Sequence, residues 1–272
     1  MAMYKDFFRP ITNTEALAYL ERLGMQKPAA ADEAALDKLI YAHQCSIPFE
    51  NINPLNSLSV SLKTDDLVKK IITEKRGGFC FELNTLFCRL LEYCGYEVHG
   101  CRAGMLWDSG PRALAHHRGN IVRIGEDNYY CDVGCGGPQP AAAIKIENGS
   151  AKTAAGETFS VSRKDEYWWI LRRAGCHGPE NILEFTLVPE FEANFITPCY
   201  YCAASPDSKF TRKLRLGLRT ENGSISVSGN TFIKTENGIR TERIINTKEE
   251  LCRITKNEFG LSLCFKRTDF HR

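Results

Sequence analysis

Cys80 has the clearest chemical setting in this sequence, because it follows two glycines and begins an apolar repeat. Apolar residues recur three and four positions apart after it and predict a buried helix from about Cys80 to Tyr93. The unpaired N–H groups and the positive dipole end of a first turn favour a thiolate and could hold a developing oxyanion. Gly77 and Gly78 permit a tight turn just before this helix. Alternatively, the glycines end a preceding helix and Cys80 is an ordinary core residue.

A thiolate nucleophile also needs a base and a group that orients the base. The sequence has six histidines, which are His43, His99, His116, His117, His177 and His271. Among them, His117 begins a predicted strand at 117–124, and the chain then turns at 125–128 and returns through 129–133. In a regular hairpin His117 shares a face with Asp132, whereas His116 points to the other face. This alternation selects His117 as the base and Asp132 as its partner.

The expected register of this hairpin leaves a gap between the two side chains. Around a four-residue turn, Ile121 would face Asp132 and His117 would lie four residues, about 13 Å, further along the strand. A bulge, for example at Gly119, or a longer turn would have to close the gap. Alternatively, Asp132 ends the strand and hydrogen-bonds the turn that follows it.

The elements that must position these residues change in type along the chain. Helical spacing predicts helices at 14–24, 34–43 and 67–74, and a capping box at Thr247 opens a last one. Period-two patterns between turn residues predict strands at 98–107, 117–124, 129–133, 159–161, 167–172, 182–188, 214–218, 224–227, 231–234 and 240–245. Helices followed by strands and a mixed end predict an α+β fold.

Composition limits the classes of function. The chain has 272 residues, a formal net charge of +2 and 12 cysteines. The near-neutral charge gives no argument for nucleic-acid binding, and no apolar run is long enough to cross a bilayer. The N-terminus lacks the apolar core of a signal peptide, so we expect a cytoplasmic protein whose cysteines are free thiols.

Several segments together resemble the arylamine N-acetyltransferases. They are Ile47-Pro48-Phe49-Glu50-Asn51-Ile52, Arg76 to Asn84, His117 to Val122 and Asp132-Val133-Gly134, with weaker matches at Glu192 to Asn194 and Ser205 to Phe210. Their order and spacing also fit this family. The resemblance is good from about Tyr19 to Phe210, and the Arg-Gly-Gly-Phe-Cys-Phe-Glu block is its most specific part.

The resemblance implies a Cys80-His117-Asp132 triad on a cysteine-protease-like core. Cys80 would take an acetyl group from acetyl-CoA and pass it to an arylamine, hydrazine or similar small amine in a ping-pong reaction, without a metal and without nucleic-acid or membrane partners. Asp132 would fix the His117 tautomer. The implied architecture is an N-terminal helical bundle (1–95) with the nucleophile, a central β-barrel-like domain (96–200) with His and Asp, and a C-terminal α/β lid (201–272).

The resemblance also implies a pocket for the acceptor, lined by Phe49, Phe81, Cys135, Gly136 and Phe210. Core packing is the alternative for each phenylalanine. Cys135 stands where family members usually carry Phe in Asp-x-Gly-Phe-Gly, so we expect a roomier pocket with weaker stacking on flat arylamines.

Other functions stay open at this point. A related acyltransferase or amide synthase could use another acyl thioester, and a cysteine-dependent thioester hydrolase would use water as the acceptor. The basic run at Arg212, Lys213 and Arg215 could bind CoA phosphates or mark the solvated face of an edge strand. Cys199-Tyr200-Tyr201-Cys202 could belong to a metal or redox module, but zinc needs a second such pair and a redox motif a thioredoxin-like setting.

Overall fold

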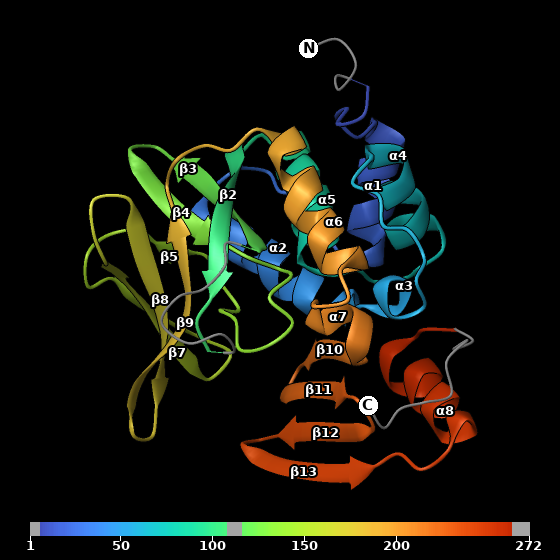
Figure 1. Ribbon diagram of the computed structural model, residues 1–272. Helices are drawn as coiled ribbons and strands as arrows, with labels where there is room; N and C mark the ends of the chain where they lie inside the picture. The colour runs from blue at the N-terminus through green and yellow to red at the C-terminus, as the bar shows by residue number, and fades with distance from the viewer. Residues whose placement is uncertain (1–5, 108–115, 263–272) are drawn as a thin grey trace.

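A computed structural model describes residues 6–107 and 116–262 of the chain. Helices from the first third lie on one side, a large antiparallel sheet lies beside them, and a smaller sheet with the last helix lies below (Figure 1). His271 and Cys264 lie outside the described residues. Within the described residues, no helix is both long and apolar enough to cross a bilayer.

The first group of elements is helical. Its members are α1 (Asn13–Arg22), α2 (Glu33–Ser46), α3 (Ile52–Leu55), α4 (Thr64–Leu67) continued by the π-helix η2 (Val68–Thr73), and α5 (Cys80–Tyr93). A capping box at Thr12 begins α1, because the Thr12 hydroxyl and the Glu15 carboxylate each accept the other residue's backbone N–H. Every residue of α5 from Cys80 to Leu91 is buried, which makes this helix the centre of the core.

A later helix packs on the same core. It is α6 (Ile196–Ala204), preceded by the 3₁₀ turn η3 (Glu192–Phe195), and the sequence patterns did not predict it. Phe195, Cys199 and Cys202 are buried in the core cluster that contains the residues of α5. Since α6 runs through residue 200, the predicted boundary at that position falls inside a helix.

The large sheet is antiparallel and curls toward a barrel. Its strand order is β5-β4-β3-β2-β9-β8-β7-β6, and β5 at one edge also contacts β6 and β7 at the other. The strands are β2 (Glu97–Met105), β3 (His117–Ile124), β4 (Asp127–Cys131), β5 (Ile144–Lys145), β6 (Ala151–Ala154), β7 (Glu157–Arg163), β8 (Trp168–Gly175) and β9 (Gly178–Thr186). Ile121, Val161, Leu171 and Phe185 fill its interior. The α+β class and the barrel-like middle are therefore confirmed.

The small sheet joins a short strand from the helical first third to strands from the last quarter of the chain. Its order is β1 (Phe49–Glu50), β10 (Arg215–Thr220), β11 (Gly223–Ser228), β12 (Thr231–Glu236) and β13 (Ile239–Ile244), with α7 (Lys209–Arg212) before it and α8 (Lys248–Phe259) after it. Thr247 caps α8 as predicted, because its hydroxyl accepts the Glu250 N–H. Strand β10 lies between β1 and β11, so the edge-strand interpretation of the basic run is wrong.

The hairpin of β3 and β4 has a tighter turn than the sequence predicted. Ile124 pairs with Asp127, so the turn contains two residues rather than four. Asn120 pairs with Cys131, which places Asp132 opposite Gly119. His117 therefore lies two residues from the position opposite Asp132, on the same face, and no bulge is needed to bring the side chains together.

Candidate active site

The segment before Cys80 is held by close packing rather than by a turn. Gly78 bridges to Phe49 in parallel, and its carbonyl accepts the Glu50 N–H at 2.8 Å. A Cβ on Gly77 would lie 1.9 Å from the Pro48 carbonyl oxygen, so these glycines are required for space. The predicted tight turn is therefore wrong, but Cys80 is the first residue of α5, as expected.

A buried group of four charges fixes this segment, and the sequence patterns did not reveal it. Arg76 donates to the Glu50 carboxylate at 2.7 Å, and the Lys70 ammonium lies 3.4 Å from the same carboxylate. Lys70 also donates to Glu82 at 2.7 Å, while the other Glu82 oxygen accepts the Phe79 N–H at 3.1 Å. Glu82 thereby caps the N-terminus of α5. Burial raises the pKa of Glu82, whereas Lys70 and Arg76 outweigh burial and lower the pKa of Glu50.

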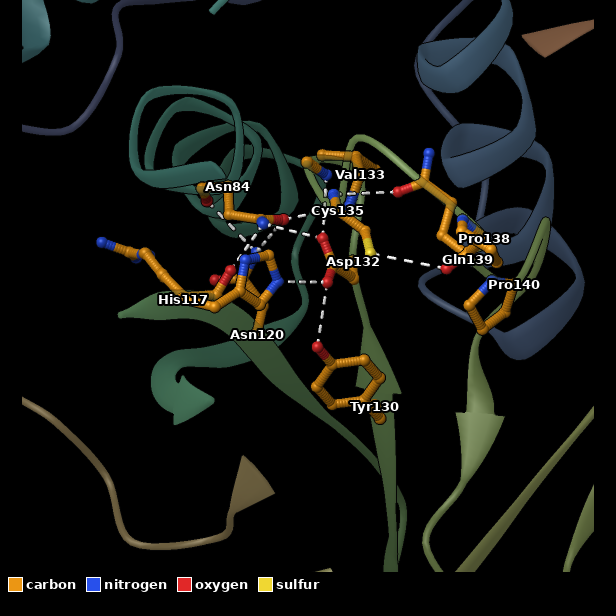
Figure 2. Close-up of polar contacts among 12 residues, drawn as sticks. Asn84, His117, Asn120, Tyr130, Asp132, Val133, Cys135, Pro138, Gln139 and Pro140 are labelled. Atoms are coloured by element: carbon orange, nitrogen blue, oxygen red, sulfur yellow. Dashed lines mark hydrogen bonds and ion pairs between the residues drawn. The ribbon is translucent and has the colours of Figure 1, made fainter. Parts of the chain in front are cut away.

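The predicted base and its partner meet directly. Nε2 of His117 lies 2.6 Å from Oδ2 of Asp132, and both residues are buried (Figure 2). Because Asp132 occupies Nε2, the other ring nitrogen, Nδ1, is the one left for a thiol. The hydrogen bond also fixes which ring edge faces the carboxylate.

Asp132 accepts three further hydrogen bonds. Oδ1 accepts from Asn84 Nδ2 at 2.9 Å and from the Gly134 N–H at 2.8 Å, and Oδ2 accepts from the Tyr130 hydroxyl at 2.9 Å (Figure 2). Burial acts to raise the pKa of Asp132, but His117, Asn84 and the Gly134 N–H outweigh it and hold the pKa below its usual value. Asp132 is thus an ionised, fully bonded carboxylate.

The loop after Asp132 lies directly against the start of α5. A Cβ on Gly134 would be 2.9 Å from Cα of Cys80 and 3.1 Å from Nδ2 of Asn84, so only glycine fits there. Asn84 is one helical turn after Cys80, and its amide oxygen accepts the Val133 N–H at 3.0 Å. These contacts bring the Asp132 loop to the nucleophile candidate.

Burial raises the pKa of the Cys80 thiol well above its usual value, and Cys202 and Asp132 raise it further. A backbone hydrogen bond at Arg118 acts in the opposite direction. The helix N-terminus therefore does not by itself make Cys80 a thiolate. The thiolate needs a nearby base that takes its proton and remains as a positive partner.

Cys80 and His117 open into one cavity of about 430 Å³. Four of the five predicted pocket residues line it, namely Phe49, Cys135, Gly136 and Phe210. The fifth, Phe81, is fully buried and packs against Phe79 and Phe195, and it is not among the described lining residues. For Phe81 the core-packing alternative therefore fits the structure.

The cavity also has a wall that the sequence did not predict. It includes Met105, Trp107, His116, Tyr201 and Cys202. His116 precedes the first residue of β3, so strand alternation does not govern its direction, and its ring lies 4.5 Å from the Tyr201 ring. Trp107 lies at the end of a predicted strand. Its position at the cavity could not be predicted from that pattern, because it depends on tertiary contacts.

Basic residues also line the cavity. Lys209, Arg212 and Arg215 line the cavity with Asp207 and Ser208, whereas Lys213 is not among its described lining residues. Arg212 donates to the backbone carbonyls of Asp207 and Ser208, which holds its guanidinium at the end of α7. Anionic groups of a ligand could bind at this part of the cavity.

Within residues 6–107 and 116–262, no group of three or more His, Cys, Asp or Glu side chains is arranged to hold a metal ion. Cys199 and Cys202 are buried thiols on α6 rather than part of a paired cysteine site.

Comparisons with known proteins find relatives with the same fold. The family model described as N-acetyltransferase matches residues 32–268. The arylamine N-acetyltransferase of Mycolicibacterium smegmatis is 27% identical over 252 residues, which cover 90% of this chain and 91% of that protein. The solved arylamine N-acetyltransferase of Salmonella typhimurium superposes with a TM-score of 0.88 at 23% identity, covering 94% of each chain.

A Mycobacterium marinum arylamine N-acetyltransferase solved in complex with CoA has a TM-score of 0.85 at 22% identity, covering 90% of this chain and 92% of that one. The family model spans most of the sequence, and the fold is that of solved members of one family. This chain therefore belongs to the arylamine N-acetyltransferases.

Proposed function

We propose that this protein transfers an acetyl group from acetyl-CoA to a small aromatic amine or hydrazine through a thioester on Cys80, with His117 as the base and Asp132 as its orienting group. The observation that carries this proposal is the single cavity into which Cys80 and His117 open, with His117 bonded to Asp132 at 2.6 Å behind it. Family membership supplies the reaction. The geometry supports the assignment of roles.

In the first half-reaction, the Cys80 proton moves to Nδ1 of His117, and Asp132 stabilises the resulting imidazolium. The thiolate sulfur then forms a bond to the thioester carbonyl carbon. As the carbon–sulfur bond to CoA breaks, the CoA sulfur takes the proton from His117 and leaves as free thiol. We assign the backbone N–H groups of Cys80 and Phe81 to the transient oxyanion, since the Phe79 N–H is bonded to Glu82.

In the second half-reaction, the neutral amine attacks the acetyl-Cys80 carbonyl carbon. The bond from that carbon to Cys80 breaks, and the amine proton passes to His117. This restores the Cys80 thiolate and the His117 imidazolium and releases the amide. A buried site suits the step, because water is the competing acceptor.

The lining of the cavity supports a division of the substrate sites. We assign the aromatic residues Phe49 and Phe210 to the acceptor, since their ring centroids lie 6.1 Å apart at the cavity. The basic residues Lys209, Arg212 and Arg215 are assigned to CoA phosphates.

Cys135 is the specificity candidate of this site. It lines the cavity, and its thiol is 3.4 Å from the Pro138 carbonyl. We expect Cys135→Phe to lower the KM for flat arylamines by narrowing the acceptor site. Unchanged arylamine kinetics would refute this assignment.

The three-part division of the chain belongs to the same proposal, with α6 crossing residue 200 and packing on the helical core. A cytoplasmic location, where thiols remain reduced, also belongs to this proposal.

The test is incubation with acetyl-CoA alone, followed by intact mass measurement and peptide mapping. We expect one acetyl adduct on Cys80, which Cys80→Ser and His117→Ala abolish together with amine-dependent CoA release. An adduct on another cysteine would refute the assignment of the nucleophile. Continued CoA release beyond one equivalent per protein without an amine would favour a hydrolase, and faster acylation by longer acyl-CoA esters would favour the related acyltransferase.

A further inference from the structure

Tyr130 makes a contact that neither the reaction nor the resemblance assigns. Its hydroxyl donates to Oδ2 of Asp132 at 2.9 Å, and this is the same oxygen that lies 2.6 Å from Nε2 of His117 (Figure 2). The phenol and the imidazole therefore share one carboxylate oxygen. A hydrogen bond from either group reduces the negative charge available to the other.

The fold holds the phenol in this place from both sides. Tyr130 is 1% exposed, and its ring stacks on Phe185 with centroids 4.3 Å apart. On the other side is Gly119, where a Cβ would lie 2.7 Å from the Tyr130 hydroxyl oxygen. Glycine inside a strand is weakening unless another group must approach closely. Here the approaching group is the Tyr130 ring.

Tyr130 and His117 are the two titratable groups that are hydrogen-bonded to the Asp132 carboxylate. The other titratable groups near Asp132 come from each element packed on it: Cys80 on α5, His43 on α2, Cys101 on β2, Cys131 on β4 and Cys135 in the following loop. Burial raises the pKa of these thiols and lowers the pKa of His43 to about 3, so all are neutral in isolation at neutral pH. The Arg118 guanidinium on β3 is paired with Glu192.

Burial and the neighbouring Asp132 raise the pKa of Tyr130 far above its usual value. The phenol therefore remains a hydrogen-bond donor throughout the working pH range.

We propose that Tyr130 is a positioning residue that limits how tightly Asp132 holds the proton on His117. This proposal rests on the proposed function, in which His117 must give its proton to the CoA sulfur and regain one from the amine. With the phenol in place, the carboxylate attracts the imidazolium less strongly, so the proton is released more readily. Tyr130 also fixes the position of Oδ2.

The test is the pH dependence of kcat/KM for acetyl-CoA in Tyr130→Phe, which keeps the ring and its stacking and removes only the hydroxyl. We expect the alkaline limb, where the imidazolium loses its proton, to move upward by about 0.5–1 pH unit. We also expect kcat to fall by up to about tenfold, because a shift of one pH unit makes proton release from His117 ten times less favourable.

Tyr129→Phe is the matched control. Tyr129 is the preceding residue on β4, and its hydroxyl donates to Glu33 at 3.0 Å instead of to Asp132. The Tyr129→Phe variant should leave the alkaline limb of the pH profile unchanged. Gly119→Ala, which displaces the phenol without removing its hydroxyl, should reproduce the shift seen in Tyr130→Phe, and thermal melts of each variant identify any loss of folding.

The outcomes separate this proposal from the proposed function. If wild-type protein forms acetyl-Cys80 and the Tyr130→Phe profile superposes on that of the wild type, the role of Tyr130 is refuted and the function stands. A shift of equal size in Tyr129→Phe also refutes the role. If wild-type protein forms no acetyl-Cys80, the proposed function itself fails.

Discussion

Asn84 joins the helix that carries Cys80 to both segments that carry His117 and Asp132. The side chain is fully buried, and its amide nitrogen donates to the Arg118 carbonyl at 2.7 Å and to Asp132 at 2.9 Å. Its amide oxygen accepts the Val133 N–H at 3.0 Å. We predict that Asn84→Ala lowers both the stability and the rate of acetylation of Cys80.

The size of the effect follows from these contacts. The substitution leaves two buried backbone groups, the Arg118 carbonyl and the Val133 N–H, without the Asn84 side chain as a hydrogen-bond partner. Each loss lowers the free energy of unfolding by about 1–3 kcal/mol. Asp132 loses one donor but keeps the Gly134 N–H. A loss of about 2–6 kcal/mol is a large part of the roughly 5–15 kcal/mol that stabilises a typical protein. We therefore expect the midpoint of thermal unfolding to fall by about 10 °C.

Urea unfolding at neutral pH measures the free energy, and rapid mixing with acetyl-CoA measures the acetylation rate. Asn120→Ala is the control, because Asn120 is equally buried and donates to the Asn84 backbone carbonyl at 3.1 Å without touching Asp132. The control should lose about 1–3 kcal/mol and acetylate Cys80 faster than Asn84→Ala. If the two variants are equally stable and equally active, the connecting role of Asn84 is refuted.

Three further predictions concern charges outside the catalytic residues. Burial lowers the pKa of His43 from 6.5 to about 3. The contribution of neutral His43 to the free energy of unfolding is therefore fully present above pH 6.5 and is lost as the pH falls toward 3. When the pH falls from 7.5 to 5, urea unfolding should show that the wild-type protein loses about 2 kcal/mol of unfolding free energy that the His43→Leu variant keeps. Equal losses in the wild type and the variant would contradict this prediction. Lys70→Met removes the ammonium from two buried carboxylates and should destabilise the protein by about 3–5 kcal/mol in thermal or urea unfolding. Its control Lys69→Met, at a side chain that is 73% exposed, should change little. Arg212→Ala should raise the KM for acetyl-CoA severalfold, whereas Lys213→Ala should not, because Arg212 lines the cavity and Lys213 is not among its described lining residues. Equal KM values in the two variants would remove Arg212 from the donor site.

The sequence was sufficient for features that depend on local spacing. The apolar repeat after Cys80 predicted the helix Cys80–Tyr93, and the capping residues at Thr247 predicted the last helix, because caps and helical faces involve residues three or four apart. Strand alternation placed His117 and Asp132 on one face, because side chains along a strand point to alternate faces. It could not give the turn length, and a turn two residues shorter than expected closed the gap.

Only the tertiary structure decided the features that join distant segments. The Asp132 carboxylate is bonded by Asn84 of α5, and the charges of Glu50, Lys70, Arg76 and Glu82 meet in one buried group, although neither of these features has a local sequence pattern. Burial also opposes the thiolate that the helix N-terminus was expected to favour at Cys80. The type and order of the chemical groups are written in the sequence, but proton affinities depend on the desolvation and partners that packing creates.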